Sequence, residues 1–281
     1  MATFATPDQL LVIIDPVARR TDGESVRIAK DVLSAGAAST KVCLPEGPEE
    51  FARVLARRGS RRPVVVGDDR ALLRTVSLLH RQRELAGCVL SMVPVGTVLG
   101  VAHTLGVPMS AVAAARAVLD GAERRLDVLV DDSDGVVLGA LRIPPLAVPA
   151  EASAMEASGR PWLQSLVRTL VPSRPPRPAP STPPPGPARL RVEVDGVTLV
   201  DLDQPVETVS VTPGSSGAAE VVVRPLSVGA EAAPLEARGR VVTVTGADFR
   251  YRADAGVAGP VRRRTWTVRE GALGLVLPTA G

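Results

Sequence analysis

A run of β-branched residues that ends in a glycine and two carboxylates constrains the fold of this chain most. Residues 63–71 read Pro-Val-Val-Val-Gly-Asp-Asp-Arg-Ala, and a segment with apolar residues at helical spacing begins at Leu72. The pattern is typical of a buried strand that turns directly into a helix. In open α/β sheets such turns lie at the carboxyl edge, where ligands bind. We therefore expect a site at this turn.

A second join of the same kind follows. Cys88–Val93 is an apolar strand, residues 94–97 read Pro-Val-Gly-Thr, and Val98–Leu105 has the composition of a short buried helix. Successive parallel strands present their carboxyl ends at one edge of a sheet. The two turns are therefore predicted to lie side by side.

The rest of the first 125 residues alternates between strand and helix patterns. Alternation of this kind predicts an open parallel α/β domain over residues 1–125. The expected strands are Gln9–Ile14 and Ser39–Leu44, and the expected helices are Gly23–Ala35, Pro48–Arg57, Leu72–Leu85 and a helix capped by Ser110 that runs to Asp120.

The period of the apolar residues changes near Leu126 from helical to alternating. Residues 126–171 are interpreted as a transition that contains a hairpin over Leu126–Leu138 and an amphipathic helix at Trp162–Val171. The proline-rich stretch Pro172–Pro187 is interpreted as an extended linker. Short alternating segments separated by turn residues then predict an antiparallel β-sandwich domain over residues 188–281.

The chain carries no recognisable targeting or membrane segment. The uncharged run Leu85–Ala115 is long enough to cross a bilayer, but Pro94, Gly96, Gly106 and Pro108 divide it into strand, turn, helix and turn, which favours a buried core segment. The residues after Met1 lack the basic and apolar regions of a signal peptide. Cys43 and Cys88 have no disulfide or metal spacing. These features predict a cytoplasmic protein, with peripheral membrane contact left open.

The two turns resemble the catalytic domain of the diacylglycerol kinase family, a branch of the superfamily that includes NAD kinase. That family carries Gly-Gly-Asp-Gly-Thr after a valine-rich strand, where residues 67–71 here read Gly-Asp-Asp-Arg-Ala. After the next strand it carries Pro-x-Gly-Thr-x-Asn-Asp-x-Ala, where residues 94–102 read Pro-Val-Gly-Thr-Val-Leu-Gly-Val-Ala. The resemblance extends to a β-rich second domain and so covers nearly the whole chain.

The resemblance implies an α/β domain that binds ATP and Mg²⁺, followed by a β-sandwich. It also implies where the nucleotide phosphates would lie. The family begins with Asn-Pro and a small-residue turn that cradles phosphate, where this chain has Asp15 and Pro16. The implied cofactor-binding residues are Gly67, Asp68, Asp69, Arg70, Gly96, Thr97 and Asp15. No metal ligand and no catalytic residue is assigned.

Several positions depart from the family pattern where phosphoryl transfer is specific about residue type. Asp68 and Arg70 replace glycines that let backbone N–H groups approach phosphate, and Leu99 replaces the asparagine. The family's late Asp-Gly-Glu, whose glutamate is the expected base, aligns with residues 258–260, Ala-Gly-Pro. A shift of a few residues would bring in Asp254 as the nearest carboxylate. A degenerate relative with weak or no kinase activity is favoured, and an active ATP-dependent lipid kinase with an altered phosphate loop is the alternative.

The expected partners follow from the same resemblance and from the charge. A lipid or anionic membrane surface and a homodimer remain open, as does a purely structural role in an oligomer. The net charge is only +3, and no nucleic acid is expected. The loop at residues 57–62, Arg-Arg-Gly-Ser-Arg-Arg, is interpreted as a solvated loop rather than a phosphate or membrane contact, because no aromatic or amphipathic segment accompanies it.

Overall fold

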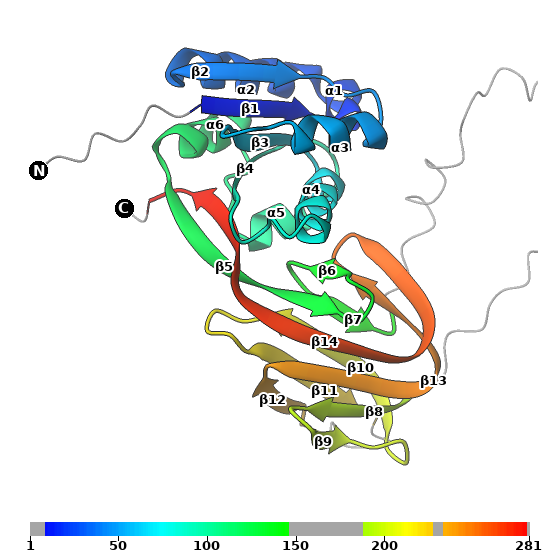
Figure 1. Cartoon of the computed structure of the whole chain (residues 1–281). Helices are drawn as coiled ribbons and strands as arrows, with labels where there is room; N and C mark the ends of the chain where they lie inside the picture. The colour runs from blue at the N-terminus through cyan, green and yellow to red at the C-terminus, as the bar shows by residue number, and fades with distance from the viewer. Residues whose placement is uncertain (1–8, 146–187, 227–232, 280–281) are drawn as a thin grey trace, which may run out of the picture.

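A computed structural model describes residues 9–145, 188–226 and 233–279. The expected helix at Trp162–Val171 and the linker Pro172–Pro187 lie outside the described residues. Figure 1 shows an α/β half above and a half built of strands below, with two long strands running between them.

The α/β half is built on four parallel strands in the order β2–β1–β3–β4. The strands are β1 (Gln9–Ile14), β2 (Ser39–Cys43), β3 (Arg62–Gly67) and β4 (Val89–Pro94). Alternate residues of β1 enter two different cores, because successive side chains of a strand point to opposite faces. Leu11 and Ile13 pack into one cluster, and Leu10 and Val12 into the other.

Each face of this sheet is covered by helices. One core contains residues of α1 (Pro16–Thr21), α2 (Gly23–Gly36) and α6 (Ala111–Asp120). The other contains residues of α3 (Pro48–Ala56), α4 (Asp69–Arg81) and α5 (Gly100–Thr104). Among the predicted helices, the one expected to begin at Leu72 begins three residues earlier, at Asp69, because Asp68 caps it. The parallel α/β sheet predicted from sequence is therefore present.

The second half consists of antiparallel pairs, as the alternating pattern predicted. Its strands form a closed circuit, because β7 pairs with β10 and β13, and both of these pair with β8. They surround a core centred on Trp266, whose ring meets that of Tyr251 edge-on at 5.2 Å. The strands are β5 (Ala122–Asp131), β6 (Val136–Val137), β7 (Leu141–Ile143), β8 (Ala188–Val194), β9 (Val197–Val200), β10 (Pro205–Pro213), β11 (Ala219–Pro225), β12 (Leu235–Gly239), β13 (Val241–Ala253) and β14 (Gly256–Leu277).

Strand β14 belongs to both halves. It pairs with β13 at one end and with β5 along the rest, and near its end Gly274 and Leu275 pair in parallel with β4. Leu273, Leu275 and Leu277 contribute to the α/β core, although the sequence analysis assigned them to the second domain. Where β14 crosses between the halves, Asp127 accepts hydrogen bonds from the N–H groups of Gly271 at 2.8 Å and Gly217 at 2.6 Å.

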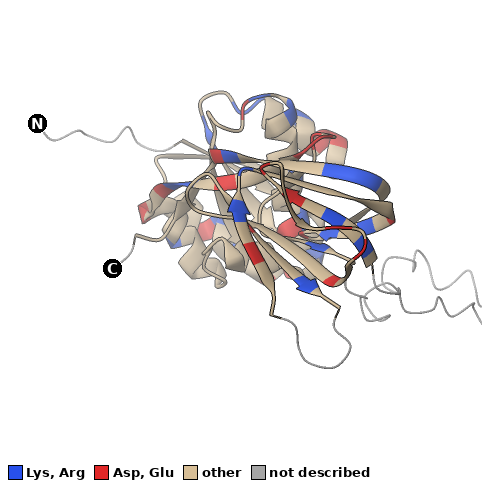
Figure 2. Ribbon diagram, turned by 90° about the horizontal axis from the view of Figure 1, so that it is seen from below, with Lys and Arg blue, Asp and Glu red and all other residues tan. Residues whose placement is uncertain are grey.

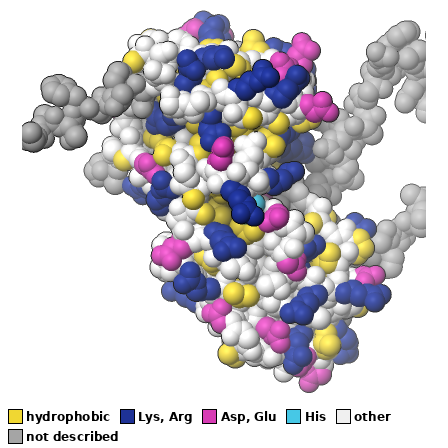
Figure 3. Space-filling model, viewed as in Figure 1, with side chains coloured by type: hydrophobic (Ala, Val, Ile, Leu, Met, Phe, Trp, Pro, Cys, Tyr) yellow, Lys and Arg dark blue, Asp and Glu magenta, His cyan; other side chains and the backbone are white. Residues whose placement is uncertain are grey.

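Other local expectations can be compared directly. The hairpin predicted over Leu126–Leu138 forms between β5 and β6, while β12 was not anticipated. Among the residues that the structure describes, no helix is both long enough and apolar enough to cross a membrane. Charges of both signs are interspersed along the strands in Figure 2 and over the face shown in Figure 3, which carries no large patch of one sign.

Candidate functional site

The turns after β3 and β4 lie side by side, as predicted. The Val95 N–H donates to the Gly67 carbonyl at 2.9 Å, and the Asp69 N–H donates to the Val98 carbonyl at 2.8 Å. Gly96 has a φ of +138°, and a Cβ added there would lie 3.0 Å from the Cβ of Asp68. Glycine at position 96 thus lets the two turns touch at Asp68.

Gly67 allows a second close approach of the backbone at the same place. A Cβ at this position would lie 2.8 Å from the Cβ of Ala71 and 3.1 Å from that of Asp15. The end of β3 therefore packs directly against both the first turn of α4 and the end of β1. Among the predicted site residues, Asp15, Gly67, Asp68 and Gly96 form one contiguous group, while Thr97 is exposed.

Asp68 occupies the N-terminus of α4 with its own carboxylate. One oxygen accepts the N–H groups of Arg70 at 3.1 Å and Ala71 at 3.2 Å. Only 7% of Asp68 is exposed, and burial raises the pKa of its carboxyl, with the charge of Asp15 adding to the effect. Helix N-termini bind anions through free N–H groups. Here the chain supplies that anion itself.

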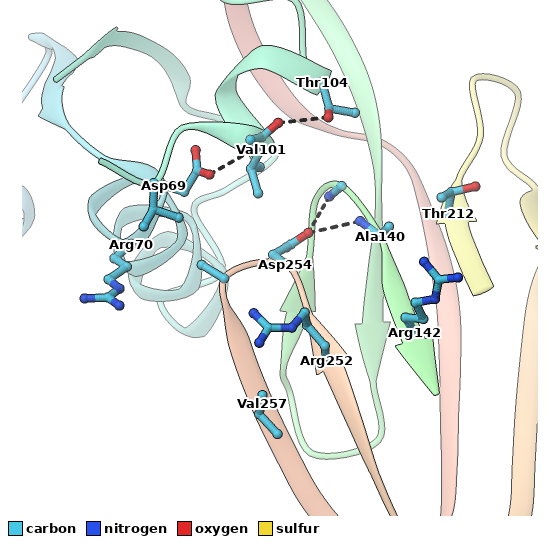
Figure 4. A pocket seen from close by; sticks show the side chains of 14 residues that line it. Asp69, Arg70, Val101, Thr104, Ala140, Arg142, Thr212, Arg252, Asp254 and Val257 are labelled. Atoms are coloured by element: carbon cyan, nitrogen blue, oxygen red, sulfur yellow. Dashed lines mark hydrogen bonds between the residues drawn. The ribbon is translucent and has the colours of Figure 1, made fainter. Parts of the chain in front are cut away.

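Asp69 performs the equivalent role for α5. It is 1% exposed, and its two carboxylate oxygens accept the N–H groups of Val101 at 2.8 Å and Ala102 at 2.9 Å. Figure 4 shows the carboxylate directed at the start of α5. Because each oxygen accepts an N–H of α5, Asp69 joins the two turns, and each oxygen keeps one further acceptor site.

Asp15 caps α1 and is also paired with a cation. Its carboxylate accepts the Val17 N–H at 2.8 Å and forms a 2.9 Å salt bridge with Arg74, whose guanidinium lies 5.7 Å from the centre of the Phe51 ring. The carboxylate that stands where the family has asparagine is thus paired with the guanidinium of Arg74.

A cavity of about 840 Å³ lies between the two halves, and we call it the cleft. Asp69 and Arg70 line it from the α/β half, and Arg142, Arg252 and Asp254 line it from the strand half. Arg70 points away from Asp254 in Figure 4. Of the predicted site residues, only Asp69 and Arg70 line the cleft.

Asp254 is the carboxylate that the strand half brings to the cleft. It accepts the N–H groups of Leu138 and Gly139 at 2.7 Å each and of Ala140 at 3.1 Å. Burial raises the pKa of its carboxyl; the three hydrogen bonds act in the opposite direction, and the charge of Asp69 acts in the same direction as burial. Pro260, which the alignment put at the position of the base, is exposed on β14 and lies outside the cleft wall.

Arg142 and Arg252 were not anticipated from the sequence. They lie on β7 and β13, 110 positions apart in the chain, and are brought together as register partners. No local pattern signals such a pairing. Asp254 did carry a weak signal, since Asp-Ala-Gly at residues 254–256 is turn chemistry between two alternating segments.

The described side chains do not fit a protein-held Mg²⁺ or a nucleotide triphosphate at the expected loop. No group of three His, Cys, Asp or Glu residues within the described ranges is placed to hold a metal ion. Each oxygen of Asp69 already accepts an N–H of α5, and two N–H groups that would cradle phosphate at the start of α4 donate to Asp68 instead. Asp68, which stands where the family has glycine, thus fills the anion site at the start of α4 with its own carboxylate.

No known family profile and no curated protein matches this sequence. Solved structures from Bacillus anthracis str. Sterne are similar over almost the full length. A candidate diacylglycerol kinase matches with a TM-score of 0.70 at 14% identity, covering 99% of this chain and 100% of that one. A structure described as a diacylglycerol kinase matches with a TM-score of 0.68 at 12% identity, covering 97% and 98%. The chain therefore has the fold of the diacylglycerol kinases.

Proposed function

We propose that this protein is a diacylglycerol kinase-like protein with weak or no kinase activity, whose cleft serves as a binding site. The carboxylate of Asp68 carries this proposal, because it accepts the two N–H groups at the start of α4. A nucleotide phosphate would have to displace a buried carboxylate from its hydrogen bonds and then lie beside its charge. Both steps oppose ATP binding.

A second feature supports weak turnover. Phosphoryl transfer to a hydroxyl needs a group that can accept its proton. Asp254 is the carboxylate nearest in sequence to the expected base, but three backbone N–H groups occupy its oxygens. Its geometry is that of a loop cap, which holds Leu138–Ala140 against the end of β13.

The experiment is calorimetry with Mg-ATP on the wild type, Asp68→Gly and the double variant Asp68→Gly/Arg70→Gly. Asp22→Gly is a matched control, because Asp22 caps α2 through the Ser25 N–H at 3.0 Å, away from the cleft. Replacing an N-cap aspartate by glycine costs only a few tenths of a kcal/mol, so the variants should remain folded. We expect at least tenfold tighter ATP binding in Asp68→Gly and no change in the control.

An active ATP-dependent lipid kinase is the second candidate, and the raised pKa of Asp254 favours it. A carboxyl with a raised pKa is a stronger base once ionised, and this one lies in the cleft. A diacylglycerol phosphorylation assay separates the candidates. Micromolar ATP binding with clear turnover by the wild type, the turnover being lost in Asp254→Asn, would overturn the proposal in favour of a kinase with an altered phosphate loop.

We also propose that the two halves act as an α/β domain and a β-sandwich domain in a cytoplasmic protein that contacts lipid at a membrane surface. The likeness to structures described as diacylglycerol kinases supports this placement. Co-sedimentation with anionic and with uncharged vesicles tests it, and equal absence from both pellets would count against membrane contact. Light scattering tests the homodimer.

A further inference from the structure

Strand β2 ends the sheet of the α/β half and leaves one edge of that sheet open. Within the described ranges it pairs only with β1, and Figure 1 shows it as the outermost strand. An edge strand exposes a row of unpaired N–H and C=O groups, to which a further strand can be added. Because β4 joins β14 at the opposite end of this sheet, the open edge is separate from the cleft.

A cavity of about 200 Å³ lies between β2 and α3, and we call it the β2 groove. Lys41 and Cys43 line it from β2, and Arg53 and Arg57 line it from α3 and the residue that follows this helix. Leu11 of β1 contributes an apolar side chain. Lys41 and Leu11 are register partners, so the groove lies on the face of the sheet that α3 covers.

The β2 groove has more cations than carboxylates. Lys41, Arg53 and Arg57 are exposed, and none of them forms a salt bridge within the described part of the chain. The one carboxylate among the lining residues is that of Glu50, which accepts the Glu46 N–H at 2.9 Å. The charge of the groove therefore fits an acidic partner.

The other face of β2 presents apolar side chains. Val42 is the register partner of Val12, which lies in the core beside α2, and Leu44 follows Val42 in the alternation. Val42 is 36% exposed and Leu44 is 48% exposed. A strand added to the open edge would direct alternate side chains to these two faces. Acidic residues would lie on the α3 face and apolar residues on the other.

A second copy of this chain fits the edge less well than a different protein does. A two-fold axis perpendicular to the sheet relates two antiparallel edge strands and keeps both α3 faces on one side. It would therefore bring the cations of two β2 grooves to the same interface, and like charges opposite each other destabilise a sheet. The strand also has only five residues and carries Lys41, features that protect edge strands from pairing with themselves.

We propose that β2 and the β2 groove bind an extended segment of another protein in which acidic and apolar residues alternate. The segment pairs with the open edge of β2, its carboxylates lie against the three cations, and its apolar side chains cover Val42 and Leu44. In this mode of recognition the main-chain hydrogen bonds supply affinity and the alternate side chains supply specificity. The inference goes beyond the proposed function, because the β2 groove and the cleft share no lining residue.

The test uses the whole chain and a fluorescein-labelled peptide, Glu-Val-Glu-Val-Glu-Val, with both ends blocked. Glu-Glu-Glu-Val-Val-Val has the same composition without the alternation, and Lys-Val-Lys-Val-Lys-Val has the alternation with the opposite charge. We expect fluorescence anisotropy to show at least tenfold tighter binding of the alternating acidic peptide than of either control. Amide hydrogen exchange within residues 39–44 should slow when this peptide binds, because the open-edge N–H groups become paired.

The variants are Lys41→Gln, Arg53→Gln, Arg57→Gln and the triple substitution, with Arg224→Gln as the control, since Arg224 is exposed on β11 in the other half. Exposed ion pairs contribute little individually, so each single substitution should weaken binding about two- to fivefold and the triple substitution about tenfold or more. Glu50→Gln should strengthen binding, because it removes the competing charge and keeps an oxygen that can accept the Glu46 N–H.

Several outcomes would overturn the proposal. They are no binding of the acidic peptide, equal binding of either control peptide, unchanged exchange within residues 39–44 on binding, and full binding by a folded triple variant. Weaker binding by Glu50→Gln would count equally against it. If exchange within residues 39–44 slows as the protein concentration rises, with no peptide present, the occupant of the edge is a second copy and the proposed partner is wrong. None of these results depends on whether Mg-ATP binds in the cleft.

Discussion

Replacing Asp127 should destabilise the junction between the two halves more than any exposed aspartate does. Asp127 is 7% exposed, and its two oxygens accept the N–H groups of Gly217 at 2.6 Å and Gly271 at 2.8 Å. Gly217 lies in the loop between β10 and β11, and Gly271 lies where β14 crosses between the halves. One side chain therefore fixes two backbone segments that are far apart in the sequence.

The size of the effect follows from these contacts. A hydrogen bond to a charged group contributes about 1.5–3 kcal/mol, and a buried donor left without an acceptor adds to the loss. Asp127→Ala removes both bonds and should lower the free energy of unfolding by about 3–5 kcal/mol, which corresponds to a fall in Tm of roughly 6–12 °C. Asp127→Asn keeps one acceptor oxygen and should cost about half as much.

Thermal and urea unfolding, followed by circular dichroism, measure this difference. Asp203→Ala is the matched control, because Asp203 is exposed in the same half of the molecule. A Tm for Asp127→Ala within 2 °C of the control would refute the reasoning, since two buried N–H groups cannot lose a shared carboxylate at so small a cost.

Two further predictions concern the cleft and its turns. Burial raises the pKa of Asp254 in the folded state, so the stability linked to this carboxyl is present below its unfolded pKa and is lost as pH rises through the folded pKa. Asp254→Asn should therefore lower the free energy of unfolding less at pH 7 than at pH 4, as measured by urea titration. A loss of stability that grows with pH would contradict the raised pKa. Gly96→Ala should destabilise the wild type by about 1–3 kcal/mol, because residue 96 has a φ of +138° and an added Cβ would lie 3.0 Å from that of Asp68. In the Asp68→Gly background this contact is gone, and Gly96→Ala should destabilise the protein clearly less. Equal losses of stability in the two backgrounds of this double-mutant cycle would show that backbone strain alone is responsible.

The parts of the fold that could be predicted from the sequence are those with local signals. A valine run followed by glycine and aspartate identified the end of β3 and the start of α4, and Pro94 and Gly96 identified the next turn. Parallel geometry alone then placed the turns together, which the hydrogen bond from Val95 to Gly67 confirms. The alternating period of the apolar residues was also sufficient to predict that the second half consists of antiparallel strands.

What could not be predicted depends on register and on side-chain direction. The pairing of Arg142 with Arg252 requires the alignment of β7 with β13, which no local pattern specifies. From the sequence, Asp68 was only a replacement of a phosphate-loop glycine and Asp69 only an implied cofactor-binding residue. Their carboxylates instead fill the N-termini of α4 and α5, an arrangement that depends on how closely Gly67 and Gly96 let the backbone approach.

The parallel pairing of β4 with β14 has a consequence for biosynthesis. Val89 and Leu90 of β4 need Gly274 and Leu275 as neighbours, and roughly 180 residues must be translated between the two strands. At about 5–20 residues per second, the ribosome takes on the order of 10–40 seconds to supply them. During that interval β4 is an uncovered apolar edge, and such edges invite pairing with other chains. A nascent chain released before residue 273 should therefore depend on chaperones, even though every helix of the α/β half has already been made.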